Sequence, residues 1–188
     1  MLIDTRSRTP QEMYRLMSGI VVPRPIAWIS TLSGAGLVNL APFSCFTFVS
    51  NSPPMIGVNI GRKAGKEKDT ARNIRRAGDF VVNIGTLSMT DLIHSSAIEF
   101  PEDESEVDAL GLETVASIGI TAPRLKIAPI SMECRLERVI EFGDTGAEFF
   151  VGQVETIHVS DELYDNGKID TARLDPVCRI AGPHYAGL

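Results

Sequence analysis

The sequence lacks the features that mark membrane-spanning, secreted and disulfide-rich proteins. Its 188 residues contain no apolar run of roughly 18 residues, the length needed to cross a membrane, so we expect no membrane partner. The opening stretch, MLIDTRSRTPQEM, is too polar for a signal peptide. The three cysteines, Cys45, Cys134 and Cys178, have no metal-type spacing. They therefore indicate reduced thiols and a cytoplasmic location.

Several catalytic motifs are also missing. There is no G-x-x-x-x-G-K-[ST] phosphate loop, no H-E-x-x-H and no paired C-x-x-C. Residues 34–36 read GAG, but they lead into an expected strand and lack the third glycine of a dinucleotide fingerprint. A Ser–His–Asp triad stays open as an alternative, although no G-x-S-x-G motif supports one. The usual ATP-binding, zinc and hydrolase signatures are therefore absent.

The net charge is negative, and the charged residues are distributed unevenly along the chain. The net charge of −6 argues against a nucleic-acid-binding protein. Residues 99–108 include six acidic and no basic side chains, and they predict a solvated loop. Residues 61–76 include seven basic side chains and only two acidic ones. A barrel that binds single-stranded nucleic acid through this basic segment is an alternative, but the segment has no aromatic residue on which bases could stack.

The pattern that is present alternates apolar and polar residues, which is typical of antiparallel strands. Strands are expected over 25–29, 37–40, 46–49, 55–60, 80–84, 130–140 and 148–160. Capping signals predict helices over about 10–19 and 70–77, and a further helix is expected over 90–98. Most strands are linked by short turns without a βαβ alternation. The sequence therefore predicts one mainly β domain over 1–188, a closed antiparallel barrel with a few peripheral helices.

The first predicted hairpin carries polar residues where packing alone would not place them. Ser30 and Thr31 end the first arm, Asn39 lies inside the second, and Ser44 follows a Pro-Phe pair. Buried polar groups cost about 1–3 kcal/mol each unless they are hydrogen-bonded. Together with the backbone N–H groups of residues 41–44, these side chains offer donors and acceptors to a planar heteroaromatic ring. We therefore predict that a ligand partners them.

The basic segment combines cationic side chains with a predicted helix start. Arg62 follows a strand, and Lys68, Asp69 and Thr70 open the helix that also carries Asn73. Free N–H groups at a helix start favour an anion, and Lys or Arg adds charge. A terminal phosphate suits this arrangement, while an ordinary capped surface helix is the alternative. A phosphate at one end and a ring at the other describe a mononucleotide-type cofactor.

Five motifs in order, RPIAWIST, a Gly-rich turn, NLAPFS, NSPP and KDTARN, resemble the flavin reductase-like, FMN-binding split-barrel family. The resemblance covers residues 24–83 with specific motifs and continues more weakly through His158 and the 179–185 segment. It implies a six-stranded antiparallel split barrel that forms a homodimer, with FMN near the subunit interface. It also implies cofactor-binding roles for Ser30, Thr31, Asn39, Ala41, Pro42, Ser44, Arg62, Lys68, Asp69, Thr70, Asn73, His158 and Tyr185.

Within that set the resemblance distributes the roles along the flavin. Ser30 and Thr31 would contact the flavin or its ribityl chain. Asn39, Ala41, Pro42 and Ser44 would line the ring pocket, and Arg62, Lys68 and Thr70 would hold the phosphate. Asp69 would cap the helix and Asn73 would support it. For His158 a purely structural role, bonded to a neighbouring side chain, is an equal alternative.

The resemblance implies an oxidoreductase in which the flavin carries the redox chemistry and no side chain acts as a nucleophile. NADH or NADPH would be the transient reductant, and free flavin, oxygen or a redox protein partner would accept the electrons. The alternative within the same chemistry is an FMN-binding electron carrier that another protein reduces. In that case the acidic 99–108 segment could steer a basic partner.

Overall fold

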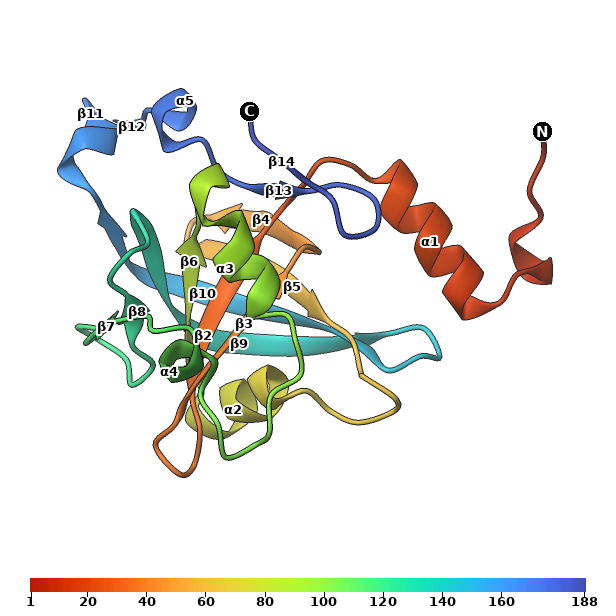
Figure 1. Cartoon of the computed structure of the whole chain (residues 1–188), viewed down its shortest axis with the longest axis horizontal. Helices are drawn as coiled ribbons and strands as arrows, with labels where there is room; N and C mark the ends of the chain where they lie inside the picture. Colours follow the sequence, from red (N-terminus) through yellow and green to blue (C-terminus); the bar gives the residue numbers. More distant parts are fainter.

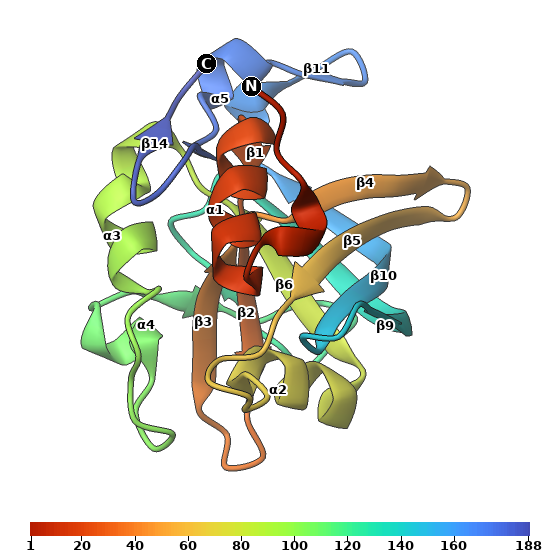
Figure 2. The same cartoon turned by 90° about the vertical axis from the view of Figure 1, so that its right-hand side faces the viewer.

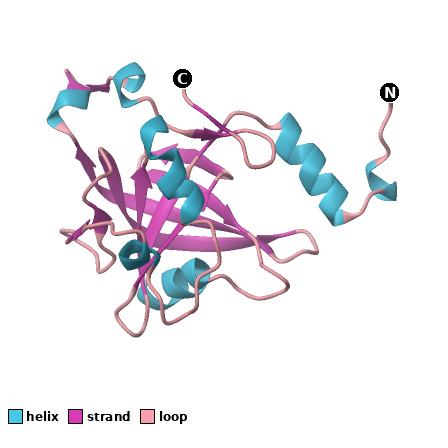
Figure 3. Ribbon diagram, in the orientation of Figure 1, coloured by secondary structure: helices cyan, strands magenta, loops and turns pink.

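The computed structural model describes all residues, 1–188, and is built around one strongly curved antiparallel sheet (Figures 1 and 3). Its seven strands lie in the order β3-β2-β6-β9-β10-β5-β4. Their bounds are β2 Ala27–Leu32, β3 Val38–Phe43, β4 Phe46–Asn51, β5 Pro54–Ile60, β6 Asp79–Ile84, β9 Ile130–Phe142 and β10 Ala147–Val159.

The two strands at the ends of this row, β3 and β4, are consecutive in the chain. Only Ser44 and Cys45 separate them, so the sheet curls until its ends meet at that corner. No strand pairing joins β3 to β4 or β5, so the wall is split along that side. The predicted split barrel is confirmed, with seven strands in the row where six were expected.

The barrel separates two apolar clusters because neighbouring side chains of a strand point to opposite faces. Ala27 and Ile29 of β2 lie in the interior cluster, together with Phe80 and Phe150. Trp28, which lies between Ala27 and Ile29, faces outward into a second cluster. Helices α3 (Thr90–Ser95) and α4 (Glu106–Ala109) and strand β8 (Arg124–Leu125) supply residues that cover this outer cluster.

The remaining elements are short and peripheral. Helix α2 (Asp69–Ala77) lies at one end of the barrel and ends at Gly78, whose φ of 73° is the left-handed cap expected from the sequence. Strands β1 (Arg24–Pro25), β13 (Cys178–Arg179) and β14 (Tyr185–Ala186) form a small separate sheet. The others are β7 Thr114–Val115, β11 Tyr164–Asp165, β12 Lys168–Ile169, α5 Thr171–Leu174 and the 3-10 turns Thr5–Ser7, Leu87–Met89 and Asp161–Leu163.

Helix α1 (Pro10–Ile20) projects away from the barrel in Figure 1 and lies in front of it in the turned view of Figure 2. It begins with the predicted capping box, in which Thr9 and Glu12 satisfy each other's backbone N–H groups. None of its residues is buried. No helix of the structure is both long and apolar enough to cross a membrane.

Two buried carboxylates hold the 117–122 loop against the outer wall. Glu133 accepts the N–H groups of Ile118 and Gly119 at 2.8 and 2.9 Å, and Asp79 accepts those of Thr121 and Ala122 at 2.9 and 3.1 Å. Burial raises the pKa of Glu133, but these N–H groups and the nearby His158 lower it, and the net shift is downward.

We predict that Glu133→Gln lowers the free energy of unfolding by about 3 kcal/mol at neutral pH, because an amide cannot replace both charge-assisted acceptors. The folded-state pKa is lowered, so this contribution is present above the ordinary value of 4.5 and disappears as the pH falls through the lowered pKa. Urea unfolding at several pH values measures it. Glu137→Gln, at an exposed position of the same strand, is the control. An equal wild-type advantage at every pH would contradict the assignment.

Candidate functional site

The N-terminus of α2 has no side-chain cap. Asp69 was predicted to cap this helix, and that prediction is wrong because Asp69 is already its first helical residue. The extended backbone that a cap requires belongs instead to Lys68, whose side chain makes no capping hydrogen bond. The Asp69 carboxylate turns to Arg72, one turn along. The first-turn N–H groups of α2 are therefore left without a side-chain acceptor.

Lys68 places an uncompensated positive charge beside this helix start. It makes no ion pair, and its ammonium lies 5.1 Å from the centre of the Phe43 ring. Burial, and secondly the charge of Lys63, lowers the pKa of Lys68. A partly desolvated cation at an uncapped helix start attracts an anion. Arg62 lies in the preceding loop, exposed and also without an ion pair.

A hydrogen-bonded network joins α2 to β2 and β3, and Asn39 is at its centre. The Asn39 side-chain oxygen accepts the hydroxyls of Thr31 at 3.3 Å and Thr70 at 3.0 Å. Asn73 donates to Thr31 at 3.1 Å. The structure therefore brings Thr31, Asn39, Thr70 and Asn73 together, as the sequence predicted. They partner one another, so the polar residues of this hairpin do not depend on a ligand for hydrogen bonds.

Glu106 of α4 completes the network and was missed by the sequence analysis. Its carboxylate accepts the Asn39 amide at 2.8 Å and the Leu40 backbone N–H at 2.9 Å, and the residue is only 8% exposed. The prediction of a solvated loop over 99–108 is therefore wrong at its C-terminal end, where residues 105–107 are buried. The one local signal was Ser105, whose hydroxyl caps α4 at the Asp108 N–H.

Ser30 differs from the other predicted polar residues because it points to the outer face. It is fully buried, donates to the Pro123 carbonyl at 2.6 Å and accepts from Asn83 at 3.1 Å. Its hydroxyl is occupied by the protein and is not open to a ligand. The predicted flavin contact of this side chain is therefore wrong, because a loop distant in sequence covers it.

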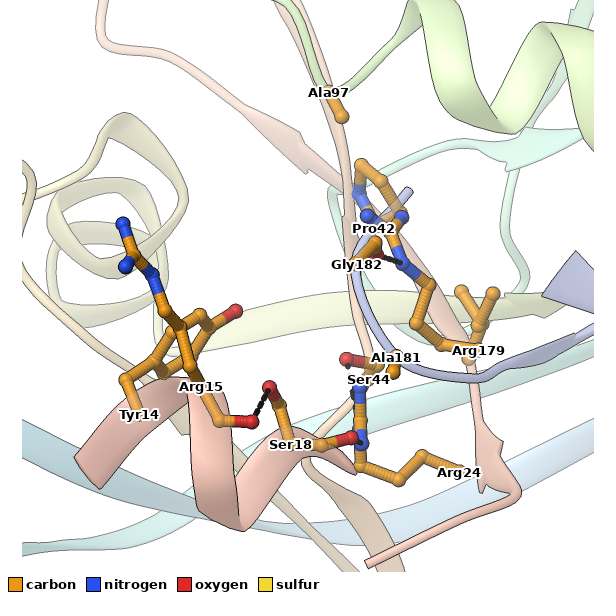
Figure 4. Close-up of a pocket in the computed structure, with 11 residues that line it drawn as sticks. Tyr14, Arg15, Ser18, Arg24, Pro42, Ser44, Ala97, Arg179, Ala181 and Gly182 are labelled. Carbon is orange, nitrogen blue, oxygen red and sulfur yellow. Dashed lines mark hydrogen bonds between the residues drawn. The ribbon is translucent and has the colours of Figure 1, made fainter. Parts of the chain in front are cut away.

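The last predicted residues of β3 lead from this network to a cavity of about 590 Å³. Leu40 directs its N–H away from β2, and backbone directions alternate along a strand, so Pro42 faces the same open edge. Ala41 lies between them and is half-buried. Pro42 and Ser44 line the cavity together with residues of α1 and of the 179–182 segment (Figure 4).

Tyr185 lies beside this cavity. Its hydroxyl accepts from Arg179, a cavity residue, at 2.5 Å, and lies 3.2 Å from His94 Nδ1. Burial raises the pKa of Tyr185, and the neighbouring Arg179 opposes the shift. Tyr185 therefore lies close to the ring end of the predicted site.

His158 lies on β10, four strands away from β3 along the sheet. In the strand register, Pro42, Trp28, Asn83, Ser131 and His158 form one row across five strands. Four strand spacings separate the ends of this row, about 19 Å along a sheet. The His158 ring nitrogen is 2.6 Å from Glu133. The structural interpretation of His158 is thus the one that the geometry supports.

The comparison with known families identifies the family to which the chain belongs. The sequence model of the flavin reductase like domain matches residues 17–173. The chain belongs to the flavin reductase-like family. The matched range contains β2, β3 and α2, the elements that form the site, and it ends before β13 and β14.

The similarity to other proteins covers nearly the whole chain. The uncharacterized protein YwrF of Bacillus subtilis is 41% identical over 95% of this chain and 90% of its own length. Among solved structures, nitrilotriacetate monooxygenase component B of Bacillus cereus is 38% identical, with a TM-score of 0.97 over 100% of this chain and 95% of that one. The 2-nitrobenzoate 2-nitroreductase NbaA of Pseudomonas fluorescens is 30% identical, with a TM-score of 0.91 over 100% and 91%.

We predict that Glu106→Gln loosens the edge of β3. The amide would place an N–H₂ group against one of two donors, the Asn39 amide or the Leu40 N–H, at a cost of about 1–3 kcal/mol. Hydrogen exchange should then show faster exchange of the Leu40 amide. Glu104→Gln, exposed in the same segment, should leave that amide unchanged. Unaltered Leu40 protection in Glu106→Gln would show that the carboxylate does not hold the strand.

Proposed function

We propose that this protein binds FMN along β3 and is an FMN-dependent oxidoreductase that takes electrons from NADH or NADPH. Free flavin, oxygen or a partner protein would receive the electrons. The observation that carries the proposal is the unpaired, partly buried Lys68 at the uncapped start of α2, within a chain of the flavin reductase-like family.

The residues at α2 suit the phosphate of FMN. Unpaired N–H groups and the Lys68 ammonium are donors that bind phosphate in proteins. Arg62, whose side chain lies against Gly146, would add a second cation from the preceding loop. Thr70 would take part through its backbone at the helix start, because its hydroxyl already donates to Asn39. Asp69 and Asn73 would act indirectly, through Arg72 and Thr31.

The open edge of β3 suits the rest of the cofactor. From Asn39 to Ser44 the chain rises about 3.4 Å per residue, so the strand spans about 17 Å between the α2 site and the cavity. The carbonyl groups of Leu40 and Pro42 face this edge, where no other strand pairs, whereas the Leu40 N–H is bonded to Glu106 and Pro42 has no N–H. An N–H group of the ring can donate a hydrogen bond to these carbonyls.

The names of two similar proteins support redox chemistry. One is a monooxygenase component and the other a nitroreductase, and both are at least 30% identical over the whole of this chain. Bound FMN would accept a hydride and pass its electrons on. The chain's own residues would hold the phosphate at α2 and orient the ring along β3. Residues 40–43 would shield one side of the ring from solvent.

The experiment that tests this function is anaerobic titration of the FMN-loaded protein with NADH and, separately, NADPH. Loss of the visible flavin bands with either nucleotide is the expected result. A protein that keeps its bands with both nucleotides, but loses them with dithionite, would contradict the reductase proposal and favour the electron-carrier alternative.

A second experiment tests the phosphate site. We predict that wild-type protein binds FMN about 10–100-fold more tightly than riboflavin, because a charge-assisted contact contributes about 1.5–3 kcal/mol. Lys68→Gln should remove most of that difference while leaving riboflavin binding unchanged. Lys126→Gln, an exposed lysine paired with Glu113, is the matched control. Equal preference for FMN in wild type and Lys68→Gln would place the phosphate elsewhere.

We further propose that the protein is a homodimer in which α1 packs against a second copy of the chain. Tyr14, Met17 and Ile20 form an apolar stripe on α1 and are 70%, 51% and 71% exposed. Phe48 and Val49 of the projecting β4–β5 hairpin are likewise exposed, at 69% and 44%. Soluble monomers rarely leave contiguous apolar surfaces of this kind open, so these residues are expected to meet a partner.

Met17→Glu should therefore shift the protein from dimer to monomer in sedimentation velocity, because it buries a charge in the interface. Asn166→Asp adds the same charge at the exposed β11–β12 turn, away from α1, and should leave the dimer intact. A wild-type protein that sediments as a monomer at all concentrations would refute the assembly.

A further inference from the structure

Two arginines face each other across the small sheet without a counter-ion. Arg24 of β1 lies directly opposite Arg179 of β13 in the antiparallel register. Directly opposed residues point to the same face, and like charges in such a pair are destabilising. Neither guanidinium makes an ion pair in the structure. The fold therefore places two arginines on adjacent strands without an acidic partner, and the Arg179 guanidinium lies 4.5 Å from the centre of the Tyr185 ring.

Neutral acceptors fix both side chains in place. Arg24 is 8% exposed and donates through Nη1 to the carbonyls of Ser18 and Val21 at 2.5 and 2.7 Å. Its Nε donates to the Ser44 hydroxyl at 3.4 Å. Arg179 donates to the Gly182 carbonyl at 2.9 Å and to the Tyr185 hydroxyl. The Nη2 atom of each arginine makes no hydrogen bond to the protein.

Both arginines line the 590 Å³ cavity, and a third arginine lines it from α1 (Figure 4). Arg15 is exposed, makes no ion pair and comes from the side of the cavity opposite to Arg179. No acidic residue lines the cavity. Its volume lies within the range of small-molecule sites, roughly 300–1,000 Å³.

We propose that this cavity binds the oxyanion, a carboxylate or phosphate group, of a second small-molecule ligand. Arginine guanidinium groups match carboxylate and phosphate oxygens in geometry and charge, and an anion between Arg24 and Arg179 would relieve their repulsion. Ser44, which also lines the cavity, would add a hydroxyl group.

The proposal deepens the proposed function and rests on it. Pro42 and Ser44 belong both to the cavity and to the β3 end where the FMN ring is proposed to lie. A ligand anchored by its oxyanion would therefore lie beside the ring. The substrate class is thus an anionic molecule, either an aromatic carboxylate or a dinucleotide carrying phosphates.

Calorimetric titration of FMN-loaded and FMN-free protein tests the site with three probes. Benzoate supplies a carboxylate, NADP⁺ supplies phosphates, and benzamide is the neutral match of benzoate. We expect benzoate or NADP⁺ to bind, and which of the two binds identifies the source of the oxyanion. Benzamide should bind at least about 10-fold more weakly than benzoate, since a charged hydrogen bond is lost.

Arg179→Gln and Arg15→Gln should each weaken binding of the anionic probe about 10-fold or more. Arg15 contacts no other side chain through a hydrogen bond, so its variant does not depend on the fold of the C-terminal segment. Arg138→Gln, exposed on the β9–β10 hairpin, is the control and should bind like wild type.

The two proposals fail in distinguishable ways. Wild-type protein that binds FMN but neither anion, or anion binding unaltered in both Arg15→Gln and Arg179→Gln, would overturn the oxyanion site and leave the flavin proposal intact. Arginine-dependent anion binding by a protein that binds no FMN would support the oxyanion site and contradict the proposed function. FMN affinity is therefore measured in every variant.

Discussion

The free edge of β3 is the constraint on which the rest of the site depends. Every strand edge carries N–H and C=O groups that need partners, and β3 has a strand on one side only. The protein satisfies part of this edge without a strand, through Glu106 at the Leu40 N–H and Ser105 at the Val38 carbonyl. Proline at 42 removes a donor altogether. What remains, between α2 and the cavity, is a stretch of backbone that the proposed FMN would cover.

Charged residues lie around this edge, and only some of them form ion pairs. The acidic 99–108 segment lies against the basic 61–76 segment, where Glu99 pairs with Lys63 and Glu102 with Arg72. This pairing offsets much of the charge that suggested a nucleic-acid partner. Lys68, over the Phe43 ring, and the arginine pair, beside Ser44, are left without anions. These uncompensated charges therefore lie close to the last residues of β3, along the proposed cofactor path.

The sequence predicted the barrel, its strands and the α2 residues because these depend on local patterns. Period-two alternation identified β9 and β10, and the glycine at 78 identified the end of α2. It could not predict Glu106, the burial of Ser30 or the Arg24–Arg179 pair. These contacts join residues 66, 93 and 155 positions apart, and no local signal encodes them. Asp69 shows the same limit, since its motif predicted a helix cap but Asp69 is the first residue of the helix. For His158 the contact with Glu133 supports the structural alternative.

The most direct test of the account is the visible absorption spectrum of the purified protein, with identification of any nucleotide released on heating. We expect two flavin bands and FMN in the supernatant, or the appearance of the bands when FMN is added to a colourless preparation. A protein that stays colourless, and that quenches the fluorescence of neither FMN nor FAD, would contradict it. The open edge of β3 would then need another occupant.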